Sequence, residues 1–402
     1  MIEKEGGNGM KIISINAGSS SLKFTLFEMD DESVIASGIF ERIGIDGSQY
    51  KIKFNGEEIK EEIEIKDHTD AVQILMDKLL SLNIIASFYE IKGVGNRVVQ
   101  GIDQYKESVV ITDSVIEDIE SFQEYAPLHN PGAILGIRAF RNVLSKVFMT
   151  AVFDTSFHQT MPEESYLYAV PSHWYQDYGV RKYGFHGTSH QYVTEYIKNV
   201  LKKDTFKMIS CHLGNGGSVT AIQDGKCVDT SMGFTPLSGI IMGTRSGDMD
   251  PSIIPYIMEK EGKNVAEVID DLNKKSGILA LSEISSDMRD LVKASEEGNE
   301  KALFAKNKYV RRVVDYIAQY YVLLGGCDAL IFTAGIGENN ITIRREICEK
   351  LSCLGVQIDL DKNQVQGEFQ KISTEDSSID VYVVPTNEEL MIARETMRLM
   401  NG

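Results

Sequence analysis

A strand–turn–strand pattern that occurs twice constrains the fold of this chain more than any other feature. In each copy, a strand with alternating apolar residues leads into a turn rich in glycine, serine or asparagine, and a second strand follows. A turn that contains aspartate and a further strand-like segment complete the copy. The paired strands occupy 11–27 and 208–223, their glycine-containing turns 18–21 and 214–218, and the aspartate turns 30–32 and 224–225. This repetition predicts a duplicated α/β domain.

Periodicity predicts several further elements around the two copies. A helix is expected over residues 69–82, with Thr69 as its N-cap, and a long helix over 307–324. The apolar run 147–153 is typical of a buried strand that ends at Asp154. A third glycine turn at 333–339 follows the apolar run 329–332, and a helix is expected over 341–351.

Length and charge limit the classes of function. A chain of 402 residues is long enough for two domains. The net charge is −18, from 41 basic and 59 acidic residues, which argues against nucleic acid or an anionic membrane as a partner. An anionic ligand therefore has to be held by local donors, because the overall field repels it.

The five cysteines and the start of the chain bear on its compartment. The number of cysteines is odd and no CxxC pair occurs, so we expect free thiols in a reducing cytoplasm and no zinc site. No apolar run reaches the length of a transmembrane helix. The polar residues 1–9 are expected to be a disordered lead-in and not a signal peptide.

The three glycine turns are candidate phosphate-binding loops. Without a Cβ in the way, backbone N–H groups can converge on phosphate oxygens, and a following helix adds a favourable dipole. None of the turns is a Walker A loop or a dinucleotide fingerprint. The alternative is three ordinary tight turns.

Two arginines stand among small residues and could bind an anion. Arg97 ends a strand-like run beside glycines, and Arg245 lies in a loop between Gly243 and Gly247. The guanidinium fork suits a carboxylate or a phosphoryl group. The alternatives are a surface salt bridge for Arg97 and a pairing of Arg245 with Asp248.

His186 and His190 have the i, i+4 spacing of zinc ligands on a helix. However, Gly187 stands where a zinc protease needs glutamate, and the neighbouring glycines favour a loop at His186. We therefore expect His186 to donate to a phosphoryl oxygen, and His190 to be a structural residue of a helix that begins there.

Carboxylates follow two apolar runs. Asp154 closes the strand 147–153, which is where α/β proteins place catalytic groups. Glu388 and Glu389 follow the run 381–384, and their hard oxygens suit Mg²⁺. The alternative for the glutamates is the first turn of a helix, where acidic residues are favourable in any case.

Ten segments, taken in order, resemble the signatures of the acetate kinase family. Each segment alone is weak, but together they span residues 10–400 and are highly specific. The segments are 16–24, 126–131, 153–158, 183–190, 212–216, 229–237, 243–251, 286–290, 335–339 and 385–389.

The resemblance implies an α/β architecture of two duplicated ribonuclease H-like domains, the actin-like ATPase fold, with the nucleotide in the interdomain cleft. The implied domains are residues 10–154 with a returning helix at 388–402, and residues 155–387. The implied reaction is reversible phosphoryl transfer between ATP and acetate, with Mg²⁺ or Mn²⁺, giving acetyl phosphate and ADP. A cytoplasmic homodimer is implied as well.

The resemblance also implies a role for individual residues. Arg97, Asp154, His186 and Arg245 would be catalytic, and Arg97, Val99, Leu128, Phe185 and Pro236 would bind the carboxylate and its methyl group. Asn16 and Glu388 would serve the metal. The nucleotide would contact Asn16, Ser19, Ser21, Lys23, His212, Asn215, Gly216, Asp287, Met288, Arg289, Gly335, Ile336 and Asn339.

Acetate is already an anion near neutral pH, so the reaction needs cationic clamps and Mg²⁺ rather than a general base. We therefore expect Asp154 to position metal or water and not to abstract a proton.

The chain also departs from the family pattern. Asn96, Gln100 and Ile102 replace two histidines and a glycine around Arg97, Ser238 replaces a glutamate, and Ala280 and Glu283 replace glycines. On the sequence alone, the effect of these changes on the catalytic rate and on the position of the Arg97 side chain stays open.

Two other functions remain open on the sequence. The first is a propionate or other short-chain carboxylate kinase, which Val99 would disfavour because its branched side chain limits room beyond a methyl group. The second is a weakly active, actin-like nucleotide-binding module, which the altered surroundings of Arg97 would favour.

Overall fold

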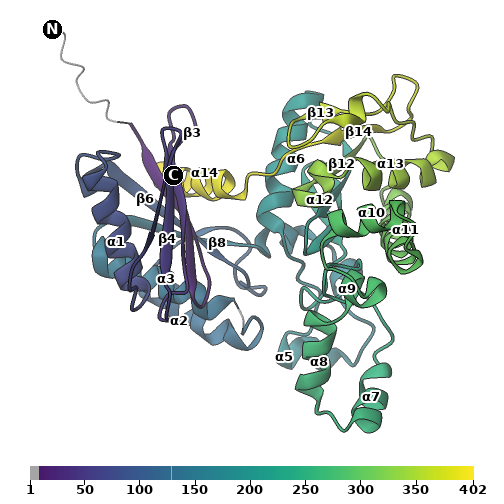
Figure 1. The fold of residues 1–402 in the computed structure, drawn as a ribbon, viewed down its shortest axis with the longest axis horizontal. Helices are drawn as coiled ribbons and strands as arrows, with labels where there is room; N and C mark the ends of the chain where they lie inside the picture. The colour runs from purple at the N-terminus through teal and green to yellow at the C-terminus, as the bar shows by residue number, and fades with distance from the viewer. Residues whose placement is uncertain (1–8, 128) are drawn as a thin grey trace. The chain divides into compact units, whose positions relative to one another are not determined.

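The computed structural model describes residues 9–127 and 129–402 and divides into two compact units (Figure 1). The first unit comprises the described part of Met1–Ser156 together with Asn387–Gly402, and the second is Phe157–Thr386. The expected lead-in falls mostly on residues 1–8, which lie outside the described part of the chain. Each unit is a mixed α/β layer structure, as the repeated strand pattern predicts.

The first unit is built on an eight-stranded sheet in the order β5-β4-β3-β2-β1-β6-β8-β7. Strands β1 to β5 form an antiparallel meander, whereas β1, β6 and β8 run parallel. The strands are β1 (Lys11–Ala17), β2 (Ser21–Glu28), β3 (Ser33–Glu41), β4 (Gln49–Phe54), β5 (Glu57–Glu62), β6 (Ile91–Val98), β7 (Val109–Val110) and β8 (Phe148–Phe153).

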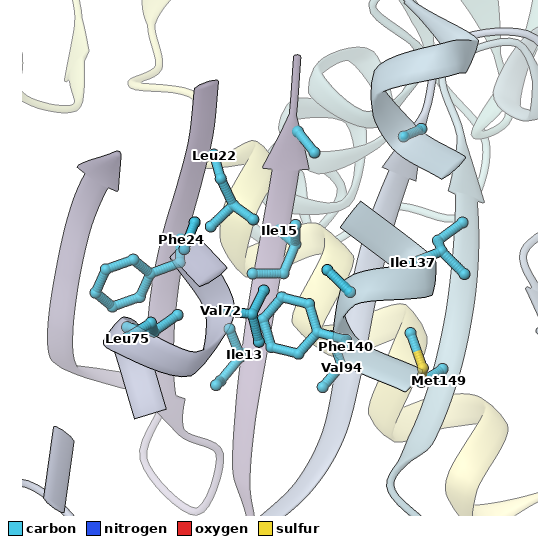
Figure 2. Packing of buried hydrophobic residues seen from close by; sticks show 14 of the residues in the cluster. Ile13, Ile15, Leu22, Phe24, Val72, Leu75, Val94, Ile137, Phe140 and Met149 are labelled. Carbon is cyan, nitrogen blue, oxygen red and sulfur yellow. The ribbon is translucent and has the colours of Figure 1, made fainter. Parts of the chain in front are cut away.

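Helices cover both faces of this sheet because successive side chains of a strand point to opposite sides. Ile13 and Ile15 of β1 pack in the core that α1 and α3 share, as Figure 2 shows. On the opposite face, α14 approaches so closely that a Cβ on Gly95 would lie 2.4 Å from Thr396 Oγ1. The helices are α1 (His68–Ser81), η1 (Phe88–Glu90), α2 (Asp113–Ser121), η2 (Phe122–Glu124), α3 (Asn130–Val143) and α14 (Glu388–Asn401).

The second unit is built on a six-stranded sheet in the order β11-β10-β9-β12-β14-β13. Strands β9, β10 and β11 form an antiparallel meander, and β9, β12 and β14 run parallel. The strands are β9 (Lys207–Leu213), β10 (Gly217–Gln223), β11 (Lys226–Thr230), β12 (Ala329–Thr333), β13 (Gln370–Lys371) and β14 (Asp380–Val383).

In this second sheet, Met208 and Ile331 pack against Val193 and Ile197 of α6. The long α11 lies over β9 and β10. The helices are η3 (Ser156–Thr160), α4 (Glu163–Tyr166), α5 (Ser172–Tyr178), α6 (Gly187–Leu201), α7 (Ile253–Glu261), α8 (Val265–Lys274), α9 (Gly277–Ser282), α10 (Met288–Glu296), α11 (Glu300–Leu324), α12 (Ala334–Asn339), α13 (Ile341–Lys350), η4 (Ser352–Leu354) and η5 (Lys362–Gln364).

The two sheets share one core order. β3-β2-β1-β6-β8 in the first unit matches β11-β10-β9-β12-β14 in the second, strand for strand and in direction. Both glycine turns join the first two strands of their meander. The duplicated ribonuclease H-like architecture of the actin-like ATPase fold is therefore confirmed.

Three local predictions are wrong. Asp67, not Thr69, caps α1, because its side chain accepts the N–H of Asp70 at 2.9 Å. The third glycine turn is instead the short helix α12, which follows β12 directly. Helix α6 begins at Gly187, so His190 lies one turn inside it.

The structure agrees with the expectation for the cysteines. All five cysteines are free thiols. Within the part of the chain that is described, no helix is long and apolar enough to cross a membrane.

Candidate active site

The first glycine turn closes the β1–β2 hairpin and lies under the start of α3. Gly18 N–H donates to Ser21 O at 2.8 Å. A Cβ on Gly132 of α3 would lie only 2.6 Å from the carbonyl carbon of Gly18, so the turn and helix pack backbone to backbone. Asn16 and Lys23 are opposite one another in the hairpin, at the end next to the turn.

Asn16 lies on the same face of β1 as Ser14, two residues earlier. Ser14 Oγ donates to the backbone oxygen of Glu389 in the first turn of α14. The predicted metal residues Asn16 and Glu388 therefore belong to neighbouring segments of the first unit.

Arg97 and Asp154 form a bidentate ion pair across the parallel strands β6 and β8. Arg97 Nε donates to Asp154 Oδ1 at 3.0 Å, and Nη2 donates to Oδ2 at 2.6 Å. The Asp154 side chain is only 2% exposed and that of Arg97 is 23% exposed. The pair is therefore not a surface salt bridge, and Asp154 holds the guanidinium in one orientation.

Two further carboxylates, Glu388 and Glu389, and one further cation, Lys23, cluster around this pair. Burial alone would lower the pKa of Arg97, but Asp154, Glu388 and Glu389 outweigh it and raise that pKa. Burial raises the pKa of Glu388 to about 7; Arg97 opposes this shift, and Asp154 and Glu389 add to it.

Lys23 is paired with Glu389, whose oxygens were expected, like those of Glu388, to suit Mg²⁺. Burial would raise the pKa of Glu389, but its bond to Lys23 keeps it below the ordinary value. Lys23 itself is exposed.

The donor set of this cluster suits Mg²⁺. Among the described residues, no group of three or more histidine, cysteine, aspartate or glutamate side chains could hold a metal ion on its own. Mg²⁺ is usually held by one or two protein oxygens together with water and substrate phosphates, so a carboxylate and an amide are sufficient. Glu388 and Asn16 fit that pattern.

Of the three departures next to Arg97, Asn96 and Gln100 are buried and Ile102 is half-buried. The Nδ2 of Asn96 donates to the backbone oxygens of Val94 and Thr150, both at 3.2 Å. Gln100 exchanges backbone hydrogen bonds with the Asn130 side chain, and its Oε1 accepts the N–H of Ile102 at 3.0 Å. Ile102 has φ 47°, which the glycine usual at this position would adopt without strain. The Gln100 side chain therefore supports a turn that has lost its glycine.

In the second unit, His186 lies at the N-cap of α6 with φ 58°. Its Nδ1 is 2.9 Å from Ser218 Oγ. Its ring stacks on that of His212, with centroids 4.0 Å apart. His212 Nδ1 in turn lies 2.8 Å from Ser189 Oγ. His186 is thus held by residues of the hairpin β9–β10.

Arg245 converges on the same point. A Cβ on Gly216 would lie 3.5 Å from Arg245 Nη1 and 3.6 Å from His186 Nε2. Arg245 Nη1 donates to Pro236 O at 3.3 Å, and burial lowers its pKa. Asp248 is bonded to Arg312 and Tyr316 instead, so the proposed pairing with Arg245 is wrong. The space above the second glycine turn is therefore faced by a guanidinium and an imidazole.

A cavity of about 610 Å³ opens beside this turn. It has room for a nucleoside. Its lining contains Asn215 and six more of the residues that the resemblance assigns to the nucleotide, namely Asp287, Met288, Arg289, Gly335, Ile336 and Asn339. Asp287 caps α10 and is paired with Arg289, which lowers its pKa.

One wall of this cavity is formed by a segment that no sequence pattern indicated. Gln366 lines it, and its Nε2 donates to Asn339 O at 3.0 Å. The fully buried Arg344 holds the adjoining segment by donating to Asn363 O and Val365 O. Neither residue belongs to a glycine turn or an apolar run, so no local signal marked them.

The predicted acetate-binding residues are divided between the units. Val99 belongs to the first unit, whereas Phe185 and Pro236 belong to the second. Leu128 lies outside the described residues. These positions stay a prediction.

Comparisons with known proteins point to one family. A model of the acetokinase family matches residues 11–394. The chain is 54% identical to acetate kinase of Geobacillus kaustophilus over 97% of this chain and 99% of the relative.

Two solved structures are similar over 97% of this chain and all of theirs. The acetate kinase of Porphyromonas gingivalis has a TM-score of 0.94 at 41% identity. A propionate kinase from Francisella tularensis has a TM-score of 0.92 at 40% identity.

Proposed function

Because this chain belongs to the acetokinase family, we propose that it catalyses reversible, Mg²⁺-dependent phosphoryl transfer between ATP and acetate, giving acetyl phosphate and ADP. The chain is an ATP:acetate phosphotransferase, with ATP and ADP as its nucleotide co-substrates. The observation that best supports the chemistry is the bidentate Arg97–Asp154 pair. In this pair, Asp154 fixes the guanidinium of Arg97 at the end of a strand, close to the carboxylates of Glu388 and Glu389.

In this proposal, Arg97 and Arg245 bind the acetate carboxylate and the transferring phosphoryl group. Acetate needs no deprotonation, so the barrier is the repulsion between two anions, which fixed cations reduce. Both oxygens of Asp154 are occupied by Arg97, so Asp154 acts through Arg97 as a positioning residue. Each oxygen of Asp154 keeps a further lone pair, so the expectation that Asp154 also positions metal or water stays a prediction.

Glu388 and Asn16 would hold Mg²⁺, which neutralises phosphate charge when bound. Ser19, Ser21 and Lys23 of the first glycine turn would bind phosphate oxygens. Lys23 is paired with Glu389 in the first turn of α14, which begins at Glu388.

The second unit would hold the nucleotide. The adenosine would occupy the cavity lined by Met288 and Ile336, and the second glycine turn would bind phosphates through Asn215, Gly216 and His212. His186 would donate through Nε2 to the transferring phosphoryl group and so stabilise the charge that it carries in the transition state.

A propionate kinase is the second candidate function, since one similar solved structure has that title. Val99, which is 9% exposed at the end of β6, favours acetate because its branched side chain would restrict a longer acid. We further propose that the enzyme is a cytoplasmic homodimer, on the strength of the family resemblance.

The test is formation of acyl phosphate, trapped with hydroxylamine, from ATP, Mg²⁺ and acetate, propionate or butyrate. We expect activity with acetate that exceeds activity with propionate. Faster turnover of propionate would favour the second candidate. Absence of acyl phosphate from every acid, in a protein that binds ATP, would overturn the proposal.

A further inference from the structure

A line of four buried or half-buried side chains leads from the interior of the second unit to His186. Ser210 Oγ lies 2.9 Å from His190 Nδ1, His190 Nε2 lies 2.8 Å from Ser218 Oγ, and Ser218 Oγ lies 2.9 Å from His186 Nδ1. Ser210, His190 and Ser218 have no exposed surface. The four residues are called the relay below.

The hydroxyl of Ser210 fixes the direction of the relay. Each hydroxyl has one proton to donate, and each neutral imidazole has one N–H and one acceptor nitrogen. Within the described residues, the hydrogen-bond partner of Ser210 Oγ is His190 Nδ1. If His190 donated to Ser210, the Ser210 proton would be buried without an acceptor, which costs free energy. Ser210 therefore donates to His190 Nδ1.

The remaining bonds follow in order. With Nδ1 as acceptor, neutral His190 carries its proton on Nε2 and donates it to Ser218 Oγ. Ser218 then has its own proton for His186 Nδ1. Burial, with His158 and His212 nearby, lowers the pKa of His190 well below its ordinary value, in keeping with a neutral ring. Each of the three hydrogen bonds of the relay then has one donor and one acceptor.

We propose that Ser218 is a positioning residue that holds His186 in its Nε2–H tautomer, so that a neutral imidazole donates from the nitrogen that faces Gly216 and Arg245. His186 Nε2 is the atom that lies 3.6 Å from the Cβ position of Gly216. In this tautomer, the Nε2–H group of His186 is a hydrogen-bond donor at that position, and the neutral ring adds no positive charge beside Arg245. The catalytic meaning of this tautomer rests on the proposed function, but the tautomer itself does not.

The test uses the full protein labelled with ¹⁵N in its seven histidines. Long-range ¹H–¹⁵N spectra distinguish the two tautomers, and substitution of His186 assigns its signals. We expect wild-type His186 to carry its proton on Nε2. Ser218→Ala should produce a mixture of tautomers or the Nδ1–H form, and should lower kcat about tenfold with little change in the KM for ATP.

Ser210→Ala tests the relay at a distance, because Ser210 does not touch His186. We expect the same change of tautomer in a smaller proportion of molecules. Ser218→Thr keeps a hydroxyl and should restore the Nε2–H form. Ser231→Ala is the matched control, since Ser231 is buried beside β10 and, among the residues that the structure describes, its Oγ accepts from the backbone N–H of Val219 and not from a histidine.

An Nδ1–H tautomer in the wild type would overturn the inference even if no variant folded. An unchanged tautomer in a folded Ser218→Ala protein would overturn it as well. If the wild type shows the Nε2–H form but makes no acetyl phosphate, the proposed function fails while the tautomer assignment stands.

Discussion

The two units place different chemistry on the same scaffold. In the first unit, the hairpin turn neighbours formal charges: Arg97 and Lys23 with Asp154, Glu388 and Glu389. In the second unit, the corresponding turn neighbours stacked imidazoles, serine hydroxyls and a single guanidinium, Arg245. Strand order and turn position are shared, but the residues around the turns are not.

The two units therefore orient their site side chains by different interactions. Ion pairs orient the cations of the first unit, so a change of charge should damage it strongly even when shape is preserved. Hydrogen bonds orient the imidazoles of the second unit, so a neutral replacement of similar shape should be tolerated better.

The largest effect should come from Asp154→Asn. The amide keeps the shape of the carboxylate but removes the charge that fixes Arg97, so kcat/KM should fall about 100- to 1000-fold. The free energy of unfolding should fall by about 3 kcal/mol, because a half-buried guanidinium loses its partner. Steady-state kinetics and urea unfolding measure the two effects.

Asp113→Asn is the matched control, because its carboxylate forms an exposed pair with Arg141 in the same unit. That variant should lose less than about 1 kcal/mol and keep its activity. Equal losses in the two variants would contradict the distinction between the pairs.

His186 should show the tolerance of the second unit. His186→Ala should lower kcat about 100-fold, since a donor to the phosphoryl group is removed. His186→Gln offers a neutral N–H and should recover about tenfold of that loss. A glutamine variant as slow as the alanine variant would break the comparison between the units.

Glu388 should make Mg²⁺ binding depend on pH. Its pKa of about 7 means that its carboxylate is protonated in the free enzyme below neutrality. The apparent affinity for Mg²⁺ should therefore fall about tenfold for each pH unit below 7, as measured from the Mg²⁺ dependence of the rate.

The same group affects folding stability. Because its folded pKa is raised, Glu388 contributes stability below about pH 4.5 that is lost as the pH rises through about 7. Glu388→Gln should weaken the pH dependence of both the Mg²⁺ affinity and the folding stability. If the apparent affinity for Mg²⁺ still fell with decreasing pH to the same extent in that variant, Glu388 would not be a ligand of the metal.

The smallest effect should be a change of specificity at Val99. Val99→Ala should favour propionate over acetate by about tenfold in relative kcat/KM, because the missing methyl groups make room for one methylene. Competing turnover of the two acids measures it. Unchanged selectivity would place the methyl group of acetate elsewhere.

The sequence predicted the architecture well because it depends on strong local signals. Alternating apolar residues and glycine turns marked β1, β2, β9 and β10, and their repetition marked the duplication. Local competition explains the errors: two polar residues could cap α1, and a glycine-containing segment after a buried strand became the helix α12.

The site was predicted less completely because distant contacts decide it. Asp154 could be recognised as a strand-end carboxylate, but only the structure shows that Arg97 occupies both of its oxygens. Gln366 and Ser218 act through partners far along the chain, so no spacing in the sequence identified them.

The most direct test of the account is ³¹P NMR of the reaction between acetyl phosphate and ADP with Mg²⁺. Wild-type protein should convert acetyl phosphate to ATP, and Arg97→Ala should do so at least about 100-fold more slowly while it still binds ADP. If acetyl phosphate persists with the wild type although ADP is bound, the chain is a nucleotide-binding module and the account is wrong.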